Sequence, residues 1–531
     1  MSETTAPNIV FIMADDLGWG NLGFHNPKNP QISTPNMDNL VMNEGLELMR
    51  HYVSKDSMPT RSSFQSGRLP IHVNTDRNDV FDPLYGLPSS MTTIATKLRD
   101  SQYSYNTHMV GKWDCGFATY SQLPTRRGYD TFYGYLSNDI DYYSKKIIPR
   151  ADGGNLCGND GTSTDETDTT MYDLWDNEEP VYTLDDAQYS EYSFSKRVID
   201  IIDEYGSDST PNPFFLMYSS HLPHSPLQLP QDYVNEYMMN GDGISENDED
   251  YCTARNEYIY PNIIDPTHDN DIIGQDFQCR QLLQAQVNLL DKIIGDIVDK
   301  LKSNNLWDNT LLFITTDNGG SLELDSTAGN NYPLRGGKYS ELEGGIRATT
   351  FISGGYLPES RRGQKEYGLT HISDWYRTFC EMLGIDATDY MAVDAGNPDV
   401  DGYNIWPLIN GEVIESPRQE LIISHDVFIS GEYKLNIGNN NNKYAIWQGE
   451  IFPNDTTPSQ NILELITLNC ADNEYNGCLF NVLLDPSEHN NLVNIEQDQF
   501  LQMKARLDEL KIGFYKNEQE GIDSCPDNFN I

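Results

Sequence analysis

The sequence predicts an α/β protein: a large, mostly parallel mixed sheet flanked by helices, followed by a smaller C-terminal α+β domain. Two observations lead to this class. Short apolar runs rich in β-branched and aromatic residues recur with helical stretches between them, which is typical of buried parallel strands. After about Ser416 the pattern changes to short strand-like pieces and one amphipathic helix. We therefore expect a large domain over residues 1–415 and a C-terminal α+β subdomain with a small antiparallel sheet over residues 416–531.

The individual elements follow from periodicity. Apolar residues three and four apart predict a helix from about Gln278 to Ser303, with one face packed on the sheet. A second amphipathic helix near Gln497–Leu510 and an Asn-rich turn at Gly438–Asn442 belong to the C-terminal part. Two acidic stretches rich in Gly, Asn and Thr are expected to be surface excursions. The predicted strands are Ile9–Ala14, Phe214–Tyr218, Leu311–Thr316 and Thr349–Ile352, and the excursions are Gly153–Glu179 and Asn240–Asp276.

The charge balance limits the classes of partner. Among the 531 residues, 81 acidic ones outnumber 35 basic ones, so the net charge is -46. Such a molecule repels nucleic acids and anionic lipid surfaces, and it suits a saline medium. The longest apolar runs are far shorter than the roughly 18 to 20 residues of a membrane span. We expect neither a nucleic-acid partner nor a membrane span.

Cysteines and the N-terminus bear on the compartment. Eight cysteines are too few for a disulfide scaffold, although the closeness of Cys470 and Cys478 permits a disulfide. The chain passes from its first seven residues directly into a strand, so its numbering has no room for a signal peptide. The sequon Asn454-Asp455-Thr456 is weak evidence for secretion. We expect a secreted or extracellular protein whose signal precedes this numbering, with a cytosolic protein as the alternative.

Acidic pairs follow two of the predicted strands. Asp15 and Asp16 come directly after Ile9–Ala14, and Asp317 and Asn318 come directly after Leu311–Thr316. The carboxyl ends of parallel strands form the ligand-binding edge of an open sheet. Four side-chain oxygens at that edge would hold Ca2+ or Mg2+. The alternative for each pair is helix capping or solvation of a loop.

Further polar groups are expected at the same edge. Ser57 precedes a Pro-led helical turn, and Arg61, four residues on, returns to the same helix face. The alternative for Ser57 is a simple N-cap. Lys112 and Lys338 each adjoin a glycine-bearing turn, and His221 and His224 follow the strand Phe214–Tyr218. A proton donor beside an anion-binding nucleophile is typical of an enzyme site.

Ordered motifs along nearly the whole chain carry a family resemblance. The sequence resembles the sulfatases of the alkaline phosphatase superfamily, most closely the arylsulfatase B-like group. This resemblance implies an alkaline phosphatase-like sulfatase fold, with residues 1–415 as the catalytic-type domain. The matching passages are Asn8–Trp19, Ser57–Arg68, Thr107–Trp113, Leu123–Asp130, His224–Gln228, Thr316–Gly320, Asn330–Lys338, Glu343–Arg347, His371–Trp375 and Asp401–Trp406.

The resemblance also implies roles for single residues. The metal ligands would be Asp15, Asp16, Asp317 and Asn318, joined by Ser57, which matches the residue that is oxidised to formylglycine. Arg61, Lys112 and Lys338 match groups that orient or neutralise the nucleophile and the sulfate, and His224 matches the proton donor to the leaving oxygen. The implied cofactors are one divalent cation, with Ca2+ favoured over Mg2+, and formylglycine at position 57.

Two positions depart from the family pattern. Ser57 stands where the precursor is usually Cys, and Asp114 stands where Gly-Lys-Trp is usually followed by His. A formylglycine hydrate has one hydroxyl to take the sulfuryl group and another to expel it, whereas serine has only one. Three histories remain open for Ser57: a serine-type precursor oxidised by a maturase, an engineered Cys-to-Ser replacement, or a naturally degenerate site.

The functional prediction is a sulfuric ester hydrolase that acts on a sulfated saccharide or an aryl sulfate ester, with a formylglycine-generating maturase as an implied partner. The alternative is a catalytically silent sulfatase-like protein with a binding or structural role. Asp114 is the residue that suggests this alternative. A third class is a phosphatase or phosphodiesterase with a plain Ser nucleophile. Relatives of that class usually bind two metals, and the sequence indicates ligands for one.

Overall fold

A ten-stranded mixed sheet forms the centre of the molecule. The computed structural model describes residues 6–29, 31–73, 86–147, 172–182, 188–207, 212–230, 233, 273–322, 328–438, 447, 449–450, 470, 473 and 475–511. The strand order is β11-β2-β10-β9-β1-β8-β4-β5-β6-β7. The strands are β1 (Asn8–Ala14), β2 (Leu46–Leu48), β4 (Asn106–Lys112), β5 (Thr131–Tyr135), β6 (Trp175–Asp176), β7 (Glu179–Pro180), β8 (Phe214–Ser219), β9 (Thr310–Thr316), β10 (Thr350–Ser353) and β11 (Gln364–Glu366).

The central strands run parallel, as the sequence predicts. β1 pairs in parallel with β8 and β9, and β4 pairs in parallel with β8 and β5. The register aligns Ala14 with Thr316, so β1 and β9 end side by side. β10 is antiparallel to β9, and β6 and β7 add a short antiparallel edge, which makes the sheet mixed. The four predicted strands are confirmed to within one residue at each end.

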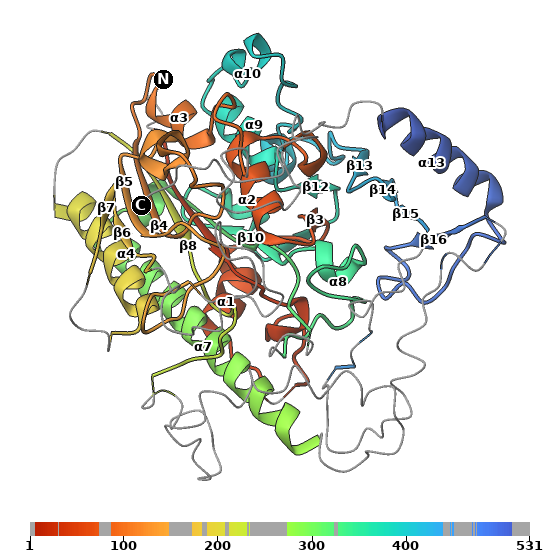
Figure 1. Ribbon diagram of the computed structural model, residues 1–531, viewed down its shortest axis with the longest axis horizontal. Helices are drawn as coiled ribbons and strands as arrows, with labels where there is room; N and C mark the ends of the chain where they lie inside the picture. The colour runs from red at the N-terminus through yellow and green to blue at the C-terminus, as the bar shows by residue number, and fades with distance from the viewer. Residues whose placement is uncertain are drawn as a thin grey trace, which may run out of the picture.

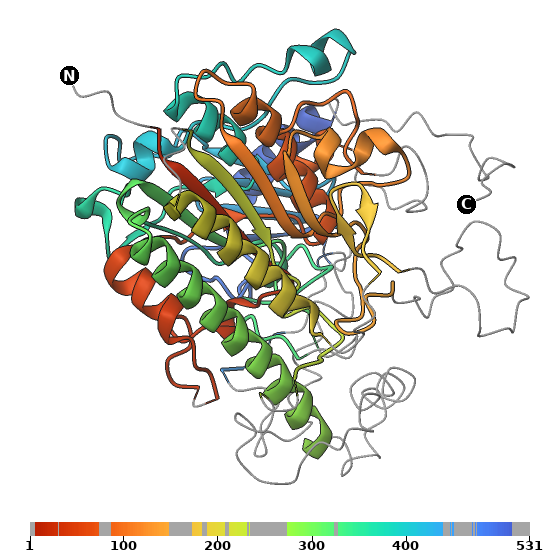
Figure 2. The same ribbon diagram turned by 90° about the vertical axis from the view of Figure 1, so that its left-hand side faces the viewer.

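Helices cover both faces of this sheet because successive strand side chains point to opposite sides. Val10 and Ile12 of β1 belong to a core built with α1, α4 and α7, whereas Ile9, Phe11 and Met13 belong to a core built with α2, α3 and α9. Figure 2 shows α4 and α7 crossing one face together. The helices are α1 (Pro35–Asn39), α2 (Ser57–Ser66), α3 (Ile94–Arg99), α4 (Ser190–Ser207), α7 (Ile273–Ser303), α8 (Glu343–Ile346), α9 (Asp374–Met382), α10 (Tyr390–Asp394) and α11 (Trp406–Asn410).

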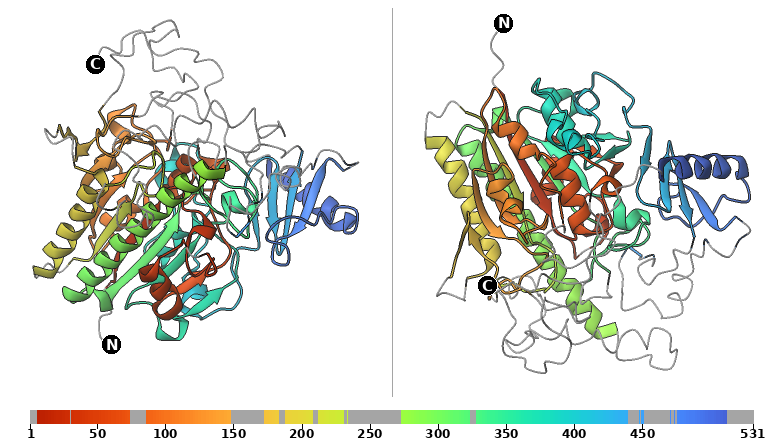
Figure 3. Two further views of the ribbon diagram at one scale, coloured as in Figure 1. Left: turned by 90° about the horizontal axis from the view of Figure 1, so that it is seen from below. Right: turned by 45° about the horizontal axis from the view of Figure 1, so that its top comes forward.

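A smaller α+β unit lies beside the main sheet (Figures 1 and 3). Its antiparallel sheet has the order β13-β14-β15-β16, and α13 packs on it through Phe500, Met503 and Leu507. The elements are β13 (Glu420–Ile422), β14 (Val427–Ser430), β15 (Tyr433–Ile437), β16 (Gly477–Asn481) and α13 (Gln497–Leu510), and a separate parallel pair joins β3 (His51–Tyr52) to β12 (Thr370–His371). The predicted helix Gln497–Leu510 is confirmed, and the domain boundary at residue 416 stays a prediction.

Other sequence expectations have mixed outcomes. The helix expected from Gln278 begins at Ile273, inside the second expected excursion. Cys470 and Cys478 form a disulfide with an S–S distance of 2.02 Å. Residues 153–171, 240–272 and 439–442 and the sequon at 454–456 lie outside the described residues. Among the helices that the structure describes, none combines the length and the apolar character that a membrane crossing needs.

Candidate active site

The carboxyl ends of four neighbouring strands bring the predicted residues together. β1 delivers Asp15 and Asp16, and β9 delivers Asp317 and Asn318. β4 ends at Lys112, and β8 leads into the segment that carries His221 and His224. The backbone N–H of Asp15 donates to the carbonyl of Leu222 at 3.0 Å, which ties that segment to the end of β1. The strand-edge rule therefore places this cluster correctly.

Three carboxylates at this edge fit a hard divalent cation. One oxygen each from Asp15, Asp16 and Asp317 lies within 4.8 Å of the others, and all three residues are buried. Asp15 Oδ1 is buried and accepts no hydrogen bond from the described residues. Asn318 joins this group, because its Nδ2 donates to Asp16 Oδ1 at 2.6 Å. A buried set of oxygen donors with an unsatisfied atom is the arrangement that Ca2+ or Mg2+ satisfies.

Each of these carboxylates has a basic side chain as a partner. Arg61 Nη2 lies 2.6 Å from Asp317 Oδ2, Lys112 Nζ lies 2.8 Å from Asp15 Oδ2, and Lys338 Nζ lies 2.9 Å from Asp16 Oδ2. All three cations are buried. Three basic groups thus face three acidic groups before a metal binds. A divalent cation would leave the set positive, which suits an anionic substrate.

Ser57 is the first residue of α2, and the helix is capped by the residue before it. The side chain of Asp56 accepts from the backbone N–H of Ser57 at 2.9 Å. The N-cap alternative for Ser57 is therefore wrong, because Asp56 fills that position. The Ser57 hydroxyl instead donates to Asn318 Oδ1 at 3.2 Å, directly beside the carboxylates.

His224 and Lys338 contact each other next to the cluster. His224 Nε2 lies 3.0 Å from Lys338 Nζ, and His224 Nδ1 lies 2.6 Å from the carbonyl of Ser225. Since a carbonyl only accepts, Nδ1 carries the proton and Nε2 accepts from the lysine ammonium. Asp114 is also buried here, with Oδ2 3.8 Å from Lys112 Nζ. All the predicted site residues thus gather in one place.

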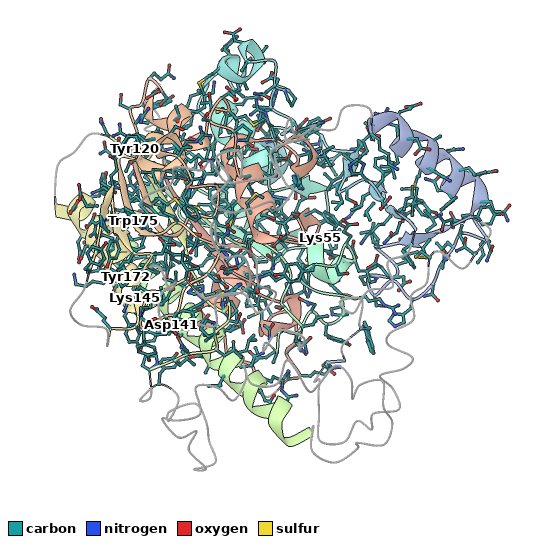
Figure 4. All side chains as sticks on the ribbon, viewed as in Figure 1. Lys55, Tyr120, Asp141, Lys145, Tyr172 and Trp175 are labelled. Carbon is teal, nitrogen blue, oxygen red and sulfur yellow. A yellow bond between two sulfur atoms is a disulfide. The ribbon has the colours of Figure 1, made fainter. Side chains whose placement is uncertain are left out.

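The segment that carries Lys338 is fixed to the start of α2. The backbone N–H of Tyr339 donates to the carbonyl of Lys55 at 2.8 Å, and Lys55 Nζ pairs with Glu341 Oε1 at 2.7 Å. Figure 4 labels Lys55 near the short helix that Figure 1 labels α8, and the labelled Tyr120 and Trp175 lie at the left of the view. These contacts tie the segment of Lys338 to the residues that precede Ser57.

Comparison with known proteins identifies the family. The Sulfatase family model matches residues 7–385, which is more than half of the chain. The chain belongs to the sulfatase family. Mouse (Mus musculus) arylsulfatase J is 31% identical over 450 residues, a match that covers 84% of this chain and 62% of that protein. Human (Homo sapiens) N-acetylgalactosamine-6-sulfatase is 23% identical over 499 residues, covering 91% of this chain and 80% of that protein.

A solved structure confirms the fold of this sulfatase. The crystal structure of Ps i-CgsB in complex with k-i-k-neocarrahexaose has a TM-score of 0.68 and 22% sequence identity, and the match covers 96% of this chain and 94% of that chain. The expected alkaline phosphatase-like sulfatase fold, a large mixed sheet with flanking helices and a smaller domain with its own sheet, is thus confirmed. The enzyme class of the family is sulfuric ester hydrolase.

Burial and charge set the protonation of the sulfatase cluster. Burial opposes ionisation of Asp15, but Lys112 and further cations outweigh it and hold the pKa of Asp15 well below its usual value. Burial, with the nearby Asp15 charge, raises the pKa of Asp317 to about 7 despite Arg61. Burial would lower the pKa of Lys338, yet the carboxylate of Asp16 raises it well above the usual value. Lys338 therefore stays charged.

Two residues contribute to the site without being predicted from the sequence. Ser219, the last residue of β8, accepts a hydrogen bond from Arg61 Nη1. Asp56 caps α2. Ser219 shares the strand-end position of the predicted residues, so the same rule indicates it. Asp56 precedes Ser57 with an Asp-Ser-x-Pro pattern that is typical of a helix start.

Proposed function

We propose that this chain hydrolyses sulfuric esters of sulfated carbohydrates or aryl sulfates, with residue 57 as the nucleophile and one divalent cation. The observation that carries this proposal is the contact between the Ser57 hydroxyl and Asn318 Oδ1 at 3.2 Å. That contact lies inside a buried set of three carboxylates and three basic side chains. A nucleophile, a cation site and positive charge for a sulfuryl group thus occur together.

The metal ligands that we propose are Asp15, Asp16, Asp317, Asn318 and residue 57. Ca2+ is favoured over Mg2+, because several carboxylate and amide oxygens suit its larger and more flexible coordination sphere. The cation would polarise a sulfuryl oxygen and activate the nucleophile. Arg61 would orient the carboxylate of Asp317 through two hydrogen bonds to its Oδ2, at 3.2 and 2.6 Å.

Lys338 and His224 would serve the leaving oxygen. The ammonium of Lys338 contacts the lone pair of His224 Nε2 at 3.0 Å, so the pair shares a proton at that point. A leaving oxygen next to this pair would receive that proton as the ester bond breaks. Lys112 would neutralise the nucleophile or the sulfate, and its Nζ lies 3.8 Å from Asp114 Oδ2.

Oxidation of residue 57 completes the proposal. Formylglycine supplies a hydrated aldehyde whose second hydroxyl allows the sulfate to be expelled. The Ser57-Met58-Pro59-Thr60-Arg61 segment supports a serine-type precursor that is matured by a dedicated oxidase. The silent-homologue alternative keeps Ser57 unoxidised and assigns a binding or structural role.

The relatives support a sulfated sugar as the substrate class. The name of N-acetylgalactosamine-6-sulfatase specifies a sugar, and the crystal structure of Ps i-CgsB is a complex with k-i-k-neocarrahexaose. We extend this class to the present chain and favour a secreted or extracellular location. The surplus of acidic residues supports a saline medium, where screening lets an anionic saccharide approach.

Mass spectrometry and sulfate release test the proposal together. The peptide that contains Ser57 is expected to be about 2 Da lighter than the unmodified peptide after maturation. Protein produced with a maturase should release sulfate from sulfated saccharides or aryl sulfates, as measured by ion chromatography, and Ser57→Ala should not. Fully oxidised, metal-loaded protein that releases no sulfate from either class would overturn the hydrolase proposal and favour the silent homologue.

A further inference from the structure

His221 has no role in the proposed reaction, yet it is buried at the edge of the site with unsatisfied nitrogens. The residue is fully buried, and neither ring nitrogen has a hydrogen-bond partner among the described residues. Buried polar side-chain atoms are nearly always paired, so two orphaned nitrogens on one ring need an explanation. A buried imidazole nitrogen without a hydrogen-bond partner can offer its lone pair to a metal ion.

The orphaned nitrogens belong to a group of possible metal ligands. One ligand atom each from Asp15, His221 and His224 lies within 4.8 Å of the others, and all three residues are buried. Asp15 Oδ1 is a second orphan in this group. Two imidazoles and one carboxylate form a donor set that differs from the all-oxygen set of Asp15, Asp16 and Asp317. Three protein ligands of this kind are typical of Zn2+.

The segment that carries both histidines is rigidly held. The hydroxyl of Tyr142 donates to the carbonyls of His221 and His224, at 2.9 and 3.0 Å. The Tyr142 ring also stacks on His221 with a centroid separation of 4.1 Å, and the backbone N–H of His221 donates to Glu191 at 3.3 Å. The ligand geometry is therefore set by the fold before any ion binds.

We propose that Asp15, His221 and His224 form a second metal site, selective for Zn2+ or a similar nitrogen-preferring ion. This site shares Asp15 with the proposed calcium or magnesium site. It also shares His224 with Lys338, because Nδ1 already donates to Ser225 and only Nε2 is left for a metal. Zinc therefore displaces the lysine ammonium from His224, and it acts as an inhibitor of the proposed hydrolase.

The binding test needs no turnover. Full-length protein saturated with Ca2+ is dialysed against Zn2+, and zinc per chain is measured by elemental analysis. His221→Phe keeps a ring to stack on Tyr142 but removes both nitrogens. The matched control is His108→Phe, since His108 is also buried but bonds to Thr131 and Tyr205, away from the cluster. Wild type and the control should bind about one zinc more per chain than His221→Phe.

Two results would overturn the zinc site. One is equal zinc content in wild type and His221→Phe, and the other is a wild type that binds no zinc. X-ray absorption at the zinc edge of the wild type covers the case in which His221→Phe does not fold. Two imidazole ligands are expected, and a shell of oxygen atoms alone would contradict the assignment.

Inhibition is a separate arm that rests on the proposed function. Zinc should lower sulfate release by the wild type and leave His221→Phe much less affected. Protein that binds zinc through His221 but releases no sulfate without zinc would refute the hydrolase and leave the zinc site standing. An active enzyme that binds no zinc would refute the zinc site and leave the hydrolase standing.

Discussion

At the scale of single residues, the site is built at turns where the backbone is strained. Asp16, Asp114 and Tyr339 have φ values of 64°, 44° and 67°, a left-handed region that non-glycine residues rarely adopt. Each is a ligand candidate or lies within two residues of a site lysine. Such strain persists where the surrounding contacts over-determine the backbone. The same turns aim Asp15, Lys112 and Lys338 at one point.

Asp317 is expected to be indispensable for cation binding. Asp317→Ala removes one of the three clustered carboxylates and leaves Arg61 without its partner at 2.6 Å. Calorimetric titration with Ca2+ and with Mg2+, backed by elemental analysis, should show loss of binding. Asp130→Ala is the control, because Asp130 bonds to Thr107 at the opposite end of β4. Unchanged stoichiometry in Asp317→Ala would refute the ligand assignment.

Asp114 separates the active enzyme from the silent homologue. Its carboxylate is buried, and its Oδ2 lies 3.8 Å from Lys112 Nζ. At that separation from a sulfate, a carboxylate costs about 1 to 4 kcal/mol. The double variant Ser57→Cys, Asp114→His, made in a host that forms formylglycine, should gain sulfate-releasing activity if the native site is silent. A folded, oxidised and metal-loaded double variant without activity would place the defect in the substrate cleft.

At the scale of elements, strand ends could be predicted from the sequence and loop partners could not. Apolar runs locate β1, β8 and β9, and the residues that follow them supply the acidic pairs and His224 of the site. The pairing of Arg61 with Asp317 and of Lys338 with Asp16 depends on the registers of separate strands and loops. The family motifs predict that these residues belong to the site, but tertiary packing decides which of them pair with one another.

The N-cap of α2 is expected to matter for both stability and activity. Asp56→Ala removes the acceptor of the Ser57 N–H and should cost about 1 kcal/mol in the free energy of unfolding. It should also lower sulfate release, because Ser57 is the first helical residue. Thr93→Ala, which removes the N-cap of α3, is the control. Urea unfolding should shift alike in both variants, and an equal loss of activity would argue against a special role for Asp56.

A buried ion cluster joins the C-terminal sheet to the segment after Lys338. Lys434 of β15 lies 3.2 Å from Glu343 Oε1 at the start of α8 and 2.9 Å from Glu488 Oε1. All three side chains are fully buried. One ammonium thus serves two carboxylates, and Tyr52 adds a hydrogen bond to Glu343 at 2.9 Å. The smaller sheet is thereby tied to the loop that holds a site lysine.

Removing Lys434 should destabilise the protein strongly. Lys434→Met removes the cation that two buried carboxylates share, although Arg347 Nη1 remains 3.6 Å from Glu343 Oε2, and it should cost about 3 to 5 kcal/mol in the free energy of unfolding. The triple variant with Glu343→Gln and Glu488→Gln should recover much of this loss, because neither of these buried side chains then carries a negative charge. Thermal and urea unfolding measure both. A single variant as stable as the wild type would show that the cluster contributes little.

At the scale of the whole molecule, composition and hydrophobic pattern predict the net charge and the fold class, but they do not predict the pKa values of buried acids. The net charge of -46 follows from counting. The burial of individual acids cannot be counted from the sequence, because it depends on which segments of the chain pack over them. Burial raises the pKa of Glu191 to about 7, and it does the same for Asp317 and Glu488. Of these three acids, only Asp317 lies in a motif that predicts a functional residue.

These acids make stability depend on pH in a defined direction. Their native pKa values of about 7 exceed the ordinary values of 3.8 for Asp and 4.5 for Glu, so between those limits the native state binds more protons than the unfolded state. By linkage, the free energy of unfolding of chelator-treated protein should fall as the pH rises from about 5 to about 7.

Self-repulsion of the acidic surface acts in the same direction, and salt separates the two effects. The fall in stability with pH should shrink in 0.5 M NaCl, a concentration at which the Debye length is below about 8 Å, but it should not vanish, because the buried acids are little screened. Urea unfolding at each pH, at low and high salt, gives both slopes. A pH dependence that salt removes entirely would assign it to the surface alone and contradict the role of the buried acids.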